Sequence, residues 1–168
     1  MNEILEEDRA RYSNKKDIPL FQVFFRKLQS THGLMHSLYK ICFRYWKKKN
    51  HVELYEQTMI EGGLYFGHPY CITINPNVII GKNCNIHKGV TIGEEKRGIR
   101  KGSPIIGDCV WIGINSTIVG KITIGTDVLI APNSYVNRDI PDHSIVFGNP
   151  CIVKSKENAT DEYINRKV

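Results

Sequence analysis

The sequence lacks the long hydrophobic runs that place a chain in a membrane. Its 168 residues contain no run of eighteen uncharged apolar residues, whereas a helix that crosses a bilayer needs about 20. The N-terminus, Met1-Asn2-Glu3-Ile4-Leu5-Glu6, also lacks the apolar stretch that a secretory signal peptide requires. We therefore expect a cytoplasmic protein.

Paired cysteines and several common catalytic motifs are also missing. The five cysteines include no Cys-x-x-Cys pair, which argues against a disulfide framework and against a cysteine zinc site. No Gly-x-Ser-x-Gly, P-loop or dinucleotide-binding fingerprint occurs. Cys84 is predicted to be a small buried apolar side chain, because it falls at an inward position of the repeat described below.

The chain has no general excess of one charge. Its net charge of +6 comes from the first fifty residues, which hold eleven Lys and Arg against five Asp and Glu. The other 118 residues hold twelve of each. A basic count in one segment is weak support for nucleic-acid binding, and we expect no nucleic-acid partner.

A period of six residues runs through residues 74–136. With one interruption, a branched apolar residue, here called an anchor, recurs at Ile74, Ile80, Ile86, Ile92, Ile106, Ile112, Ile118, Ile124, Ile130 and Val136. Four positions after each anchor stands a small or β-branched residue, such as Val78 or Ser116. Short internal periods are typical of solenoids.

The period predicts a mainly β fold, a parallel β-helix of triangular coils. Six residues allow one short strand and one corner, so three such units close a coil of about eighteen residues. The anchors then stack inside, one coil above the next. Glycine follows several anchors, as at Gly81, Gly107 and Gly125. We expect these glycines to form corners because glycine accepts positive φ.

The interruption lies between Ile92 and Ile106, which are fourteen residues apart. Residues 93–104 contain no anchor, six charged residues and further glycines. We predict a loop that projects from the coil, and loops on a rigid scaffold often carry function.

The chain is expected to have three parts: a helical segment over 1–50, the repeat domain over 51–153 with its loop 93–104, and a polar tail over 154–168. The period is degenerate over 51–73 and is predicted to lose register over 137–144. Pro19 is a plausible helix start, and Gly33 is expected to divide the helical segment. The tail is expected to be irregular or a short helix.

Apolar residues spaced by three and four make a stripe along residues 20–48. Its members are Phe21, Phe24, Phe25, Leu28, Leu34, Leu38, Ile41, Cys42 and Tyr45. One interpretation is a helix that caps the first coil. The other is that residues 20–49, basic and aromatic, rest on an anionic membrane surface, which would place the protein at the inner face of the membrane.

Two of the six histidines are candidates for chemistry. His68 stands where the count of six slips, and a histidine can take a proton from a hydroxyl near neutral pH. Glu53 lies almost one coil earlier and would stack roughly beneath it. His87 follows an anchor and points outward, either as an exposed coil residue or into a cleft between subunits. His32 and His36 are four apart but have no evident third metal ligand.

The repeat, the loop and the ending Ile-Pro-Asp-His-Ser-Ile-Val-Phe-Gly-Asn-Pro over 140–150 resemble the left-handed β-helix, hexapeptide-repeat acyltransferases. Residues 63–68 and 85–93 resemble the serine acetyltransferase branch, which includes O-acetyltransferases of capsule and exopolysaccharide synthesis. The resemblance covers about residues 52–153. It implies a homotrimer with active sites between neighbouring β-helices and acetyl-CoA as donor, without a metal.

The resemblance also implies roles for individual residues. His68 falls on the general base, and Glu53 on the acidic residue that orients it. The acceptor side is expected to involve Gly67, His87, Arg97 and Ser103. The donor is expected to lie along Gly113, Ile114, Asn115, Ala131, Pro132 and Asn133, with Lys154 or Lys156 near its phosphates.

Two departures from the branch concern serine itself. Its serine-binding aspartate is Gly67 here, and its Arg-His-Pro falls on Gly102-Ser103-Pro104. A buried zwitterion needs countercharges. The sequence therefore favours a sugar hydroxyl of a capsular or exopolysaccharide unit as acceptor. The alternatives are a serine O-acetyltransferase of cysteine biosynthesis and a non-catalytic β-helical scaffold.

Overall fold

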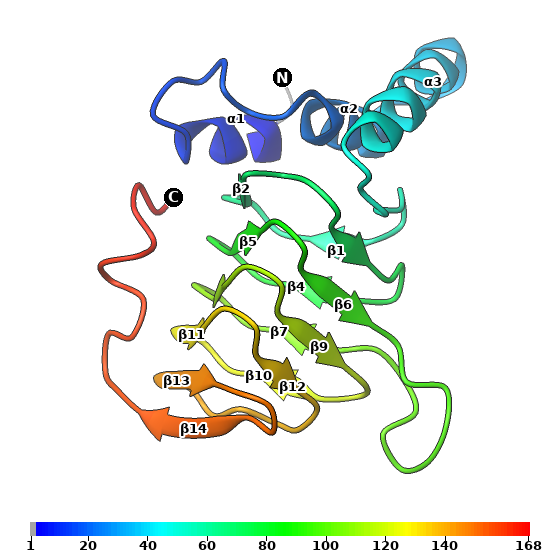
Figure 1. The fold of residues 1–168 in the computed structure, drawn as a ribbon. Coiled ribbons are helices and arrows are strands. Elements are labelled where there is room, and N and C mark those ends of the chain that lie inside the picture. The colour runs from blue at the N-terminus through cyan, green and yellow to red at the C-terminus, as the bar shows by residue number, and fades with distance from the viewer. Residues whose placement is uncertain (1–2) are drawn as a thin grey trace.

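The computed structural model describes residues 3–168 and contains three helices followed by short strands (Figure 1). The helices are α1 (Glu3–Ala10), α2 (Leu20–Gln29) and α3 (Gly33–Lys49). The strands are β1 (Met59–Ile60), β2 (Tyr65–Gly67), β3 (Thr73–Ile74), β4 (Ile79–Ile80), β5 (Asn85–His87), β6 (Thr91–Gly93), β7 (Ile105–Ile106), β8 (Trp111–Ile112), β9 (Thr117–Val119), β10 (Thr123–Ile124), β11 (Val128–Ile130), β12 (Tyr135–Val136), β13 (Ser144–Phe147) and β14 (Ile152–Ser155).

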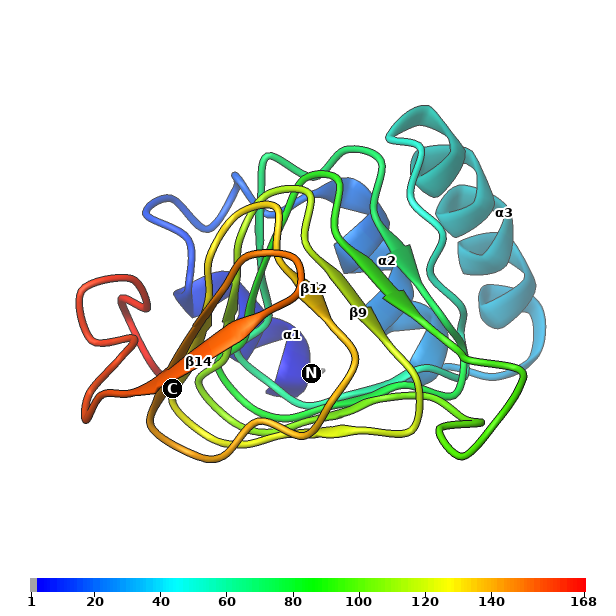
Figure 2. The ribbon, with the colours of Figure 1, turned by 60° about the horizontal axis from the view of Figure 1, so that its bottom comes forward.

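The strands form three sheets, and the chain visits them in turn. Sheet A has the order β12-β9-β6-β3, sheet B the order β1-β4-β7-β10, and sheet C the order β14-β13-β11-β8-β5-β2. Neighbouring strands are parallel except for β14, which pairs antiparallel with β13. Viewed along the stack, the coils have a roughly triangular outline (Figure 2). The predicted mainly β architecture of parallel strands is confirmed.

The anchors stack in register inside the coils, as the period predicts. On sheet A, Ile74 pairs with Ile92, Ile92 with Ile118, and Ile118 with Val136. These four side chains have an exposed fraction of 0%. Full burial of such a side chain is worth about 1.5–3 kcal/mol, so the ladder of anchors is a main source of stability.

The structure identifies the first and last coils of the stack, where the six-residue period is irregular. Phe66 pairs with Ile86 and is 2% exposed, so residues 51–73 include a first coil with Phe66 as one of its anchors. At the other end, Ile140 bridges to Ile124, and Val146 pairs with Ile130. The six-residue step is lost here as predicted, since Ile140 follows Val136 by only four residues, but this shortened unit still belongs to a fifth coil that continues the stack.

The prediction about the glycines that follow the anchors is also wrong. Gly81, Gly107 and Gly125 are not among the positive-φ residues. Their absent side chain has another cause. A Cβ at Gly107 would stand 2.9 Å from the carbonyl carbon of Gly125. Successive coils approach too closely here for any side chain. Much of the left-handed conformation at corners falls instead on other residues, such as Asn83 and Asp127.

The N-terminal helices close one end of the stack. Helix α2 starts directly after Pro19, and Phe21, Phe25 and Leu28 are buried in the same core as the anchors. Figure 1 shows α1 and α2 lying across the first coil. The prediction of a helical cap is thus confirmed, as is the division of the helical segment before Gly33.

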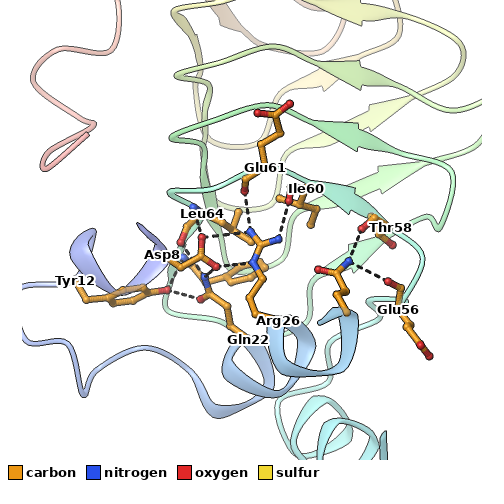
Figure 3. Close-up of polar contacts among 11 residues, drawn as sticks. Asp8, Tyr12, Gln22, Arg26, Glu56, Thr58, Ile60, Glu61 and Leu64 are labelled. Atoms are coloured by element: carbon orange, nitrogen blue, oxygen red, sulfur yellow. Dashed lines mark hydrogen bonds and ion pairs between the residues drawn. The ribbon is translucent and has the colours of Figure 1, made fainter. Parts of the chain in front are cut away.

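A buried polar network fastens this cap (Figure 3). Arg26, 1% exposed, donates from Nε to Oδ2 of Asp8 at 2.8 Å, and its other nitrogens donate to the carbonyls of Ile60 and Glu61. Asp8 accepts in turn from the backbone N–H of Leu64 at 2.9 Å. Because a buried charge is tolerated only when it is paired, these contacts tie α1 and α2 to the first coil.

Helix α3 does not use the predicted stripe. Leu34, Leu38, Ile41 and Tyr45 are between 50% and 87% exposed, whereas Phe43 is 3% exposed and packs into the core. Tyr39 and Trp46 pack against the same core. The first coil covers the apolar face of α2, so that helix has no apolar face left for a membrane surface. The membrane interpretation of residues 20–49 thus gains no support from α2, although the stripe on α3 is exposed. Among residues 3–168, no helix is long and apolar enough to span a bilayer.

The C-terminal tail, residues 156–168, returns along sheet C toward the helices (Figure 1). It contains turns and no helix. Near its start, the backbone N–H groups of Ala159 and Thr160 and the Thr160 hydroxyl donate to the carboxylate of Asp127 at 2.7–2.9 Å. At its end, the N–H of Val168 donates to Oδ1 of Asn83 at 2.9 Å. The tail therefore lies along the coil stack from the corner at Asp127 to the corner at Asn83.

Candidate functional site

A cavity of about 710 Å³ lies where the N-terminal segment, sheet C and the C-terminal tail meet. Its walls combine residues that are far apart in the chain. They include Arg11, Tyr12, Asp17, Trp46, Asn50, Tyr65, His68, Asn85, His87, Trp111, Tyr163, Asn165 and Arg166. The two candidate histidines, nineteen positions apart in the sequence, thus share one cavity.

His68 is exposed and occupies the first position of the corner between β2 and β3, with a φ of 52°. The left-handed backbone turns the chain sharply after sheet C. In this position the imidazole is open to solvent and to a ligand in the cavity, as a general base requires.

His87 ends β5 one coil further along and is half-buried. Its ring centroid lies 4.7 Å from that of Trp111, and its buried Nε2 has no hydrogen-bond partner among residues 3–168. Burial and, to a lesser extent, the proximity of His68 lower the pKa of His87. A neutral imidazole at physiological pH can either donate or accept a hydrogen bond, so His87 is suited to bind a polar ligand in the cavity.

Gly67 has a packing reason for being glycine. It pairs with His87, and a Cβ at position 67 would collide with the His87 imidazole. The space in which a side chain at position 67 would begin is therefore occupied from the next coil. The imidazole of His87 therefore requires glycine at position 67.

Glu53 lies on the first coil, where it bridges to Thr73, and its side chain is exposed. Its backbone N–H donates to the carbonyl of Ile72 at 2.7 Å. Within residues 3–168, the structure records no hydrogen bond between the Glu53 carboxylate and His68. The orienting role of Glu53 stays a prediction.

The loop 93–104 is on a different edge of the stack from His68. It connects sheet A to sheet B, whereas His68 lies between sheets C and A. Glu95 and Gly102 bridge antiparallel at its base, and Ser103 Oγ donates to Oδ1 of Asn75 at 3.1 Å. Figures 1 and 2 show the loop standing out from the coils. Arg97 and Ser103 do not line the cavity of their own chain.

The predicted donor residues lie on the same edge as the histidines. This histidine edge consists of the corners from sheet C to sheet A, at residues 68–72, 88–90, 113–116 and 131–134. Backbone bonds run down it: the N–H of Lys88 donates to Gly67 O at 3.1 Å, that of Asn115 to Lys88 O at 3.0 Å, and that of Asn133 to Ile114 O at 2.9 Å. The structure thus brings His68, His87 and all six predicted donor residues to one edge.

Close backbone packing shapes this edge. A Cβ on Gly113 would stand 2.6 Å from the backbone nitrogen of Pro132. Lys154, by contrast, belongs to β14, and its ammonium lies 5.6 Å from the ring centroid of Phe147. It does not line the cavity.

The described residues show no metal centre. Over residues 3–168, no group of three or more His, Cys, Asp or Glu side chains is arranged to hold an ion. His36 instead contacts Glu56, with 3.1 Å between Nε2 and Oε1. Cys84 is fully buried, as predicted, and burial raises the pKa of its thiol to about 12.

Several cavity residues escaped the sequence reasoning. Asn85 and Trp111 occupy outward positions next to anchors on sheet C, and a large aromatic at such a position is a usable signal. Arg11, Tyr163 and Arg166 carry no such signal, because they come from the two ends of the chain, outside the period.

Residues 103–138 match the family model "bacterial transferase hexapeptide (six repeats)". This part of the chain is similar to the hexapeptide repeat of bacterial transferases. Over 99 residues, or 59% of its length, it is 34% identical to the serine acetyltransferase of Staphylococcus xylosus and 32% identical to serine acetyltransferase 2 of Arabidopsis thaliana. These matches cover 46% and 31% of those proteins. The chain thus spans less than half the length of these curated relatives.

The solved structures that resemble this chain also include serine acetyltransferases. The serine acetyltransferase of Neisseria gonorrhoeae in complex with serine is 25% identical, with a TM-score of 0.71. The superposition covers 90% of the present chain and 68% of the Neisseria gonorrhoeae chain. The enzyme from Brucella abortus superposes with a TM-score of 0.77 at 21% identity, which shows a shared fold.

These relatives overturn one prediction. The sequence favoured a sugar acceptor and the capsule and exopolysaccharide group of enzymes, yet the similar proteins are serine acetyltransferases. The sugar assignment is wrong. It rested on the loss of countercharges at Gly67 and over Gly102-Ser103, for which the loop cations Arg97, Arg100 and Lys101 were considered the only substitutes.

Proposed function

We propose that this chain is an acetyl-CoA-dependent O-acetyltransferase whose acceptor is the hydroxyl of L-serine. One observation carries the proposal: His68 and His87 share a cavity at the upper end of an edge along which the predicted donor residues stack. An acyl transfer needs a base beside the acceptor and a donor site that leads to it. The similarity to serine acetyltransferases supplies the acceptor.

In the proposed reaction, His68 takes the proton from the serine hydroxyl. The oxygen then attacks the thioester carbonyl of acetyl-CoA, so that a C–O bond forms and the C–S bond breaks. The proton on His68 passes to the leaving thiolate, which gives O-acetylserine and CoA. Backbone N–H groups at the edge would stabilise the developing oxyanion, and Glu53 would orient His68.

We also propose the finer features of the family for this chain: a left-handed β-helix and a homotrimer. The arrangement of the edges supports a trimer, because the loop 93–104 and His68 lie on different edges of one chain. A neighbouring copy could bring its loop, with Arg97 and Ser103, to the cavity. The three-part division at residues 50 and 153 and the cytoplasmic location stay predictions.

The test is acetyl transfer to L-serine, followed by release of CoA. The His68→Ala variant should lose at least about a hundredfold in kcat, since a general base contributes 10²–10⁴. Its control is His51→Ala. His51 is also exposed and has a φ of 51°, but it does not line the cavity.

Both variants should keep the oligomeric state of the wild type by size-exclusion chromatography. Near-normal turnover in His68→Ala, or an equal loss in both variants, would refute His68 as the base. The rival scaffold hypothesis predicts no heat of binding when acetyl-CoA is titrated into the protein. Saturable binding together with serine-dependent CoA release excludes the scaffold.

A further inference from the structure

The cavity around His68 has an unbalanced charge. Its charged lining residues are Arg11, Asp17 and Arg166, beside the two histidines. Among the ion pairs recorded for residues 3–168, neither arginine takes part in one. The cavity thus contains two guanidinium groups against one carboxylate, and the loop 93–104 contributes nothing to it within the chain.

Arg11 is a buried cation without a counter-anion. It is 3% exposed, and its recorded hydrogen bonds all go to neutral oxygens: Gly63 O at 3.3 Å, Asn83 Oδ1 at 3.4 Å and Asn85 Oδ1 at 2.6 Å. Its Nε is buried and has no partner. A buried charge is costly unless it is paired, so an anion in the cavity would offset a cost already present in the fold.

Arg166 is exposed, has no recorded partner among residues 3–168 and adopts a φ of 54°. Its backbone lies between two fixed points of the tail. On one side, Nδ2 of Asn85 donates to the carbonyl of Tyr163 at 3.3 Å. On the other, Asn83 exchanges two hydrogen bonds of 2.9 Å with the backbone of Val168. The Arg166 backbone is thereby placed beside the cavity, which this residue lines.

The same two asparagines connect the arginines. Asn83 and Asn85 each accept a hydrogen bond from Arg11. Asn85 also bonds to the tail before Arg166, at Tyr163, and Asn83 bonds to it after Arg166, at Val168. Arg11 and the tail are therefore both contacted by two residues of one coil, two positions apart in the sequence. This arrangement brings two cations to the cavity that contains the histidines.

We propose that the two ends of the chain form a carboxylate subsite in this cavity, in which Arg166 contacts the carboxylate of the acceptor and Arg11 supplies buried positive charge beneath it. The subsite rests on the proposed function for the identity of its ligand. It replaces, with residues of other segments, the countercharge missing at Gly102-Ser103. Charge-assisted guanidinium–carboxylate bonds are among the strongest polar contacts in proteins.

The experiment compares L-serine with L-serinamide, which keeps the hydroxyl but lacks the carboxylate. The wild type should show a KM for L-serine at least about tenfold below that for L-serinamide, since a hydrogen bond to a charged group is worth about that factor or more. Arg166→Gln should remove this preference, and Arg166→Lys should keep part of it. The KM for acetyl-CoA should not change.

Lys167→Gln is the matched control. Lys167 is the adjacent cation on the tail, but it pairs with Asp161 at 3.0 Å and does not line the cavity. Because Arg166 is exposed, its substitution should not unfold the protein, which is a risk with Arg11. A loss of preference in both variants would indicate a general charge effect and overturn the subsite.

A binding measurement separates this inference from the proposed function. Both tryptophans of the chain, Trp46 and Trp111, line the cavity, so intrinsic fluorescence reports ligands there. If L-serine binds more tightly than L-serinamide through Arg166 but is not acetylated, the subsite stands and the function fails. If serine is acetylated and Arg166→Gln behaves like wild type, the function stands and the subsite fails.

Two further outcomes overturn the subsite. One is a wild type that does not distinguish the two acceptors in KM or in binding. The other is an Arg166→Gln variant whose KM rises for acetyl-CoA and not for L-serine, which would assign the cation to the phosphates of the donor.

Discussion

The two ends of this chain are attached to the coil stack by different means. The N-terminal segment buries Phe21, Phe25 and the Arg26–Asp8 pair against the first coil. The C-terminal tail lies along sheet C and is held largely by side chains of the coils, among them Asp127 and Asn85, which bond to its backbone.

This difference matters because both ends also line the cavity. The N-terminal segment packs its apolar side chains into the core, and its removal would expose the anchors of the first coil. The tail buries few apolar side chains, mainly Ala159 and Ile164. Segments with few buried apolar contacts open locally at low free-energy cost. One wall of the cavity is therefore firm and the other is able to open.

The sharpest way to break this comparison is to remove a charge from the firm end. Arg26→Ala leaves Asp8 buried without its cation, and breaking a buried pair typically costs about 3–5 kcal/mol. The free energy of unfolding from urea titration should fall by that amount. Lys27→Ala, on the same helix but only half-buried, should cost under about 1 kcal/mol. A small loss in both variants would show that the cap is not part of the cooperative core, and a large loss in both would show that the buried pair is not its cause.

A smaller effect is expected at the tail. Asp127→Asn weakens the three bonds from Ala159 and Thr160. The free energy of local opening of the tail, measured by exchange of its amides, should fall by roughly the 1.5–3 kcal/mol of a charged hydrogen bond. The urea midpoint should hardly change. Asp142→Asn is the control, because the Asp142 carboxylate accepts from the N–H of Thr126 in the same corner but has no recorded bond to the tail among residues 3–168. A large drop in global stability with Asp127→Asn would mean that the tail unfolds together with the core.

The smallest effect is a pH dependence of the tail. Burial opposes ionisation of Asp127, but hydrogen bonds from His143 and Thr160 outweigh it, so its pKa lies below the ordinary value. The bond to Asp127 and the nearby charge of Glu157 raise the pKa of His143. Stability from Asp127 is thus present above about pH 4 and is lost below it, as the pH falls through the depressed pKa.

Stability from His143 has the opposite sign. It is fully present below about pH 6.5 and is lost as the pH rises through the raised pKa. The amides of Ala159 and Thr160, corrected for intrinsic exchange, should therefore be better protected at pH 6 than at pH 8. His143→Gln should remove that difference. An unchanged difference in this variant would place its origin elsewhere.

Much of the fold could be predicted from the sequence because its signal is local and repeated. Each anchor needs only its own six-residue unit to be recognised, and the buried Ile ladder followed. The prediction failed where an anchor was aromatic, at Phe66, or where a unit was shortened, before Ile140. The glycines were misassigned because close approach between coils and positive φ both select glycine.

The site was only half predictable. His68 and His87 follow from the slip in the period and from a family motif, and one cavity indeed contains both. Arg11 and Arg166 depend on contacts between the two ends of the chain through Asn83 and Asn85, which no local pattern encodes. The sugar assignment considered only charges within the family motifs and the loop, so it did not take account of the two arginines that line the cavity.

Strand β14 has a consequence for the solution behaviour of the protein. A stack of parallel strands ends in a row of unpaired backbone groups, which invites another copy to continue it. On sheet C the chain turns back at this point, and β14 covers β13 in the antiparallel sense. The new edge is four residues long and carries Lys154. Short edges with lysine resist edge-to-edge aggregation, so this end of sheet C is protected against growth into fibres.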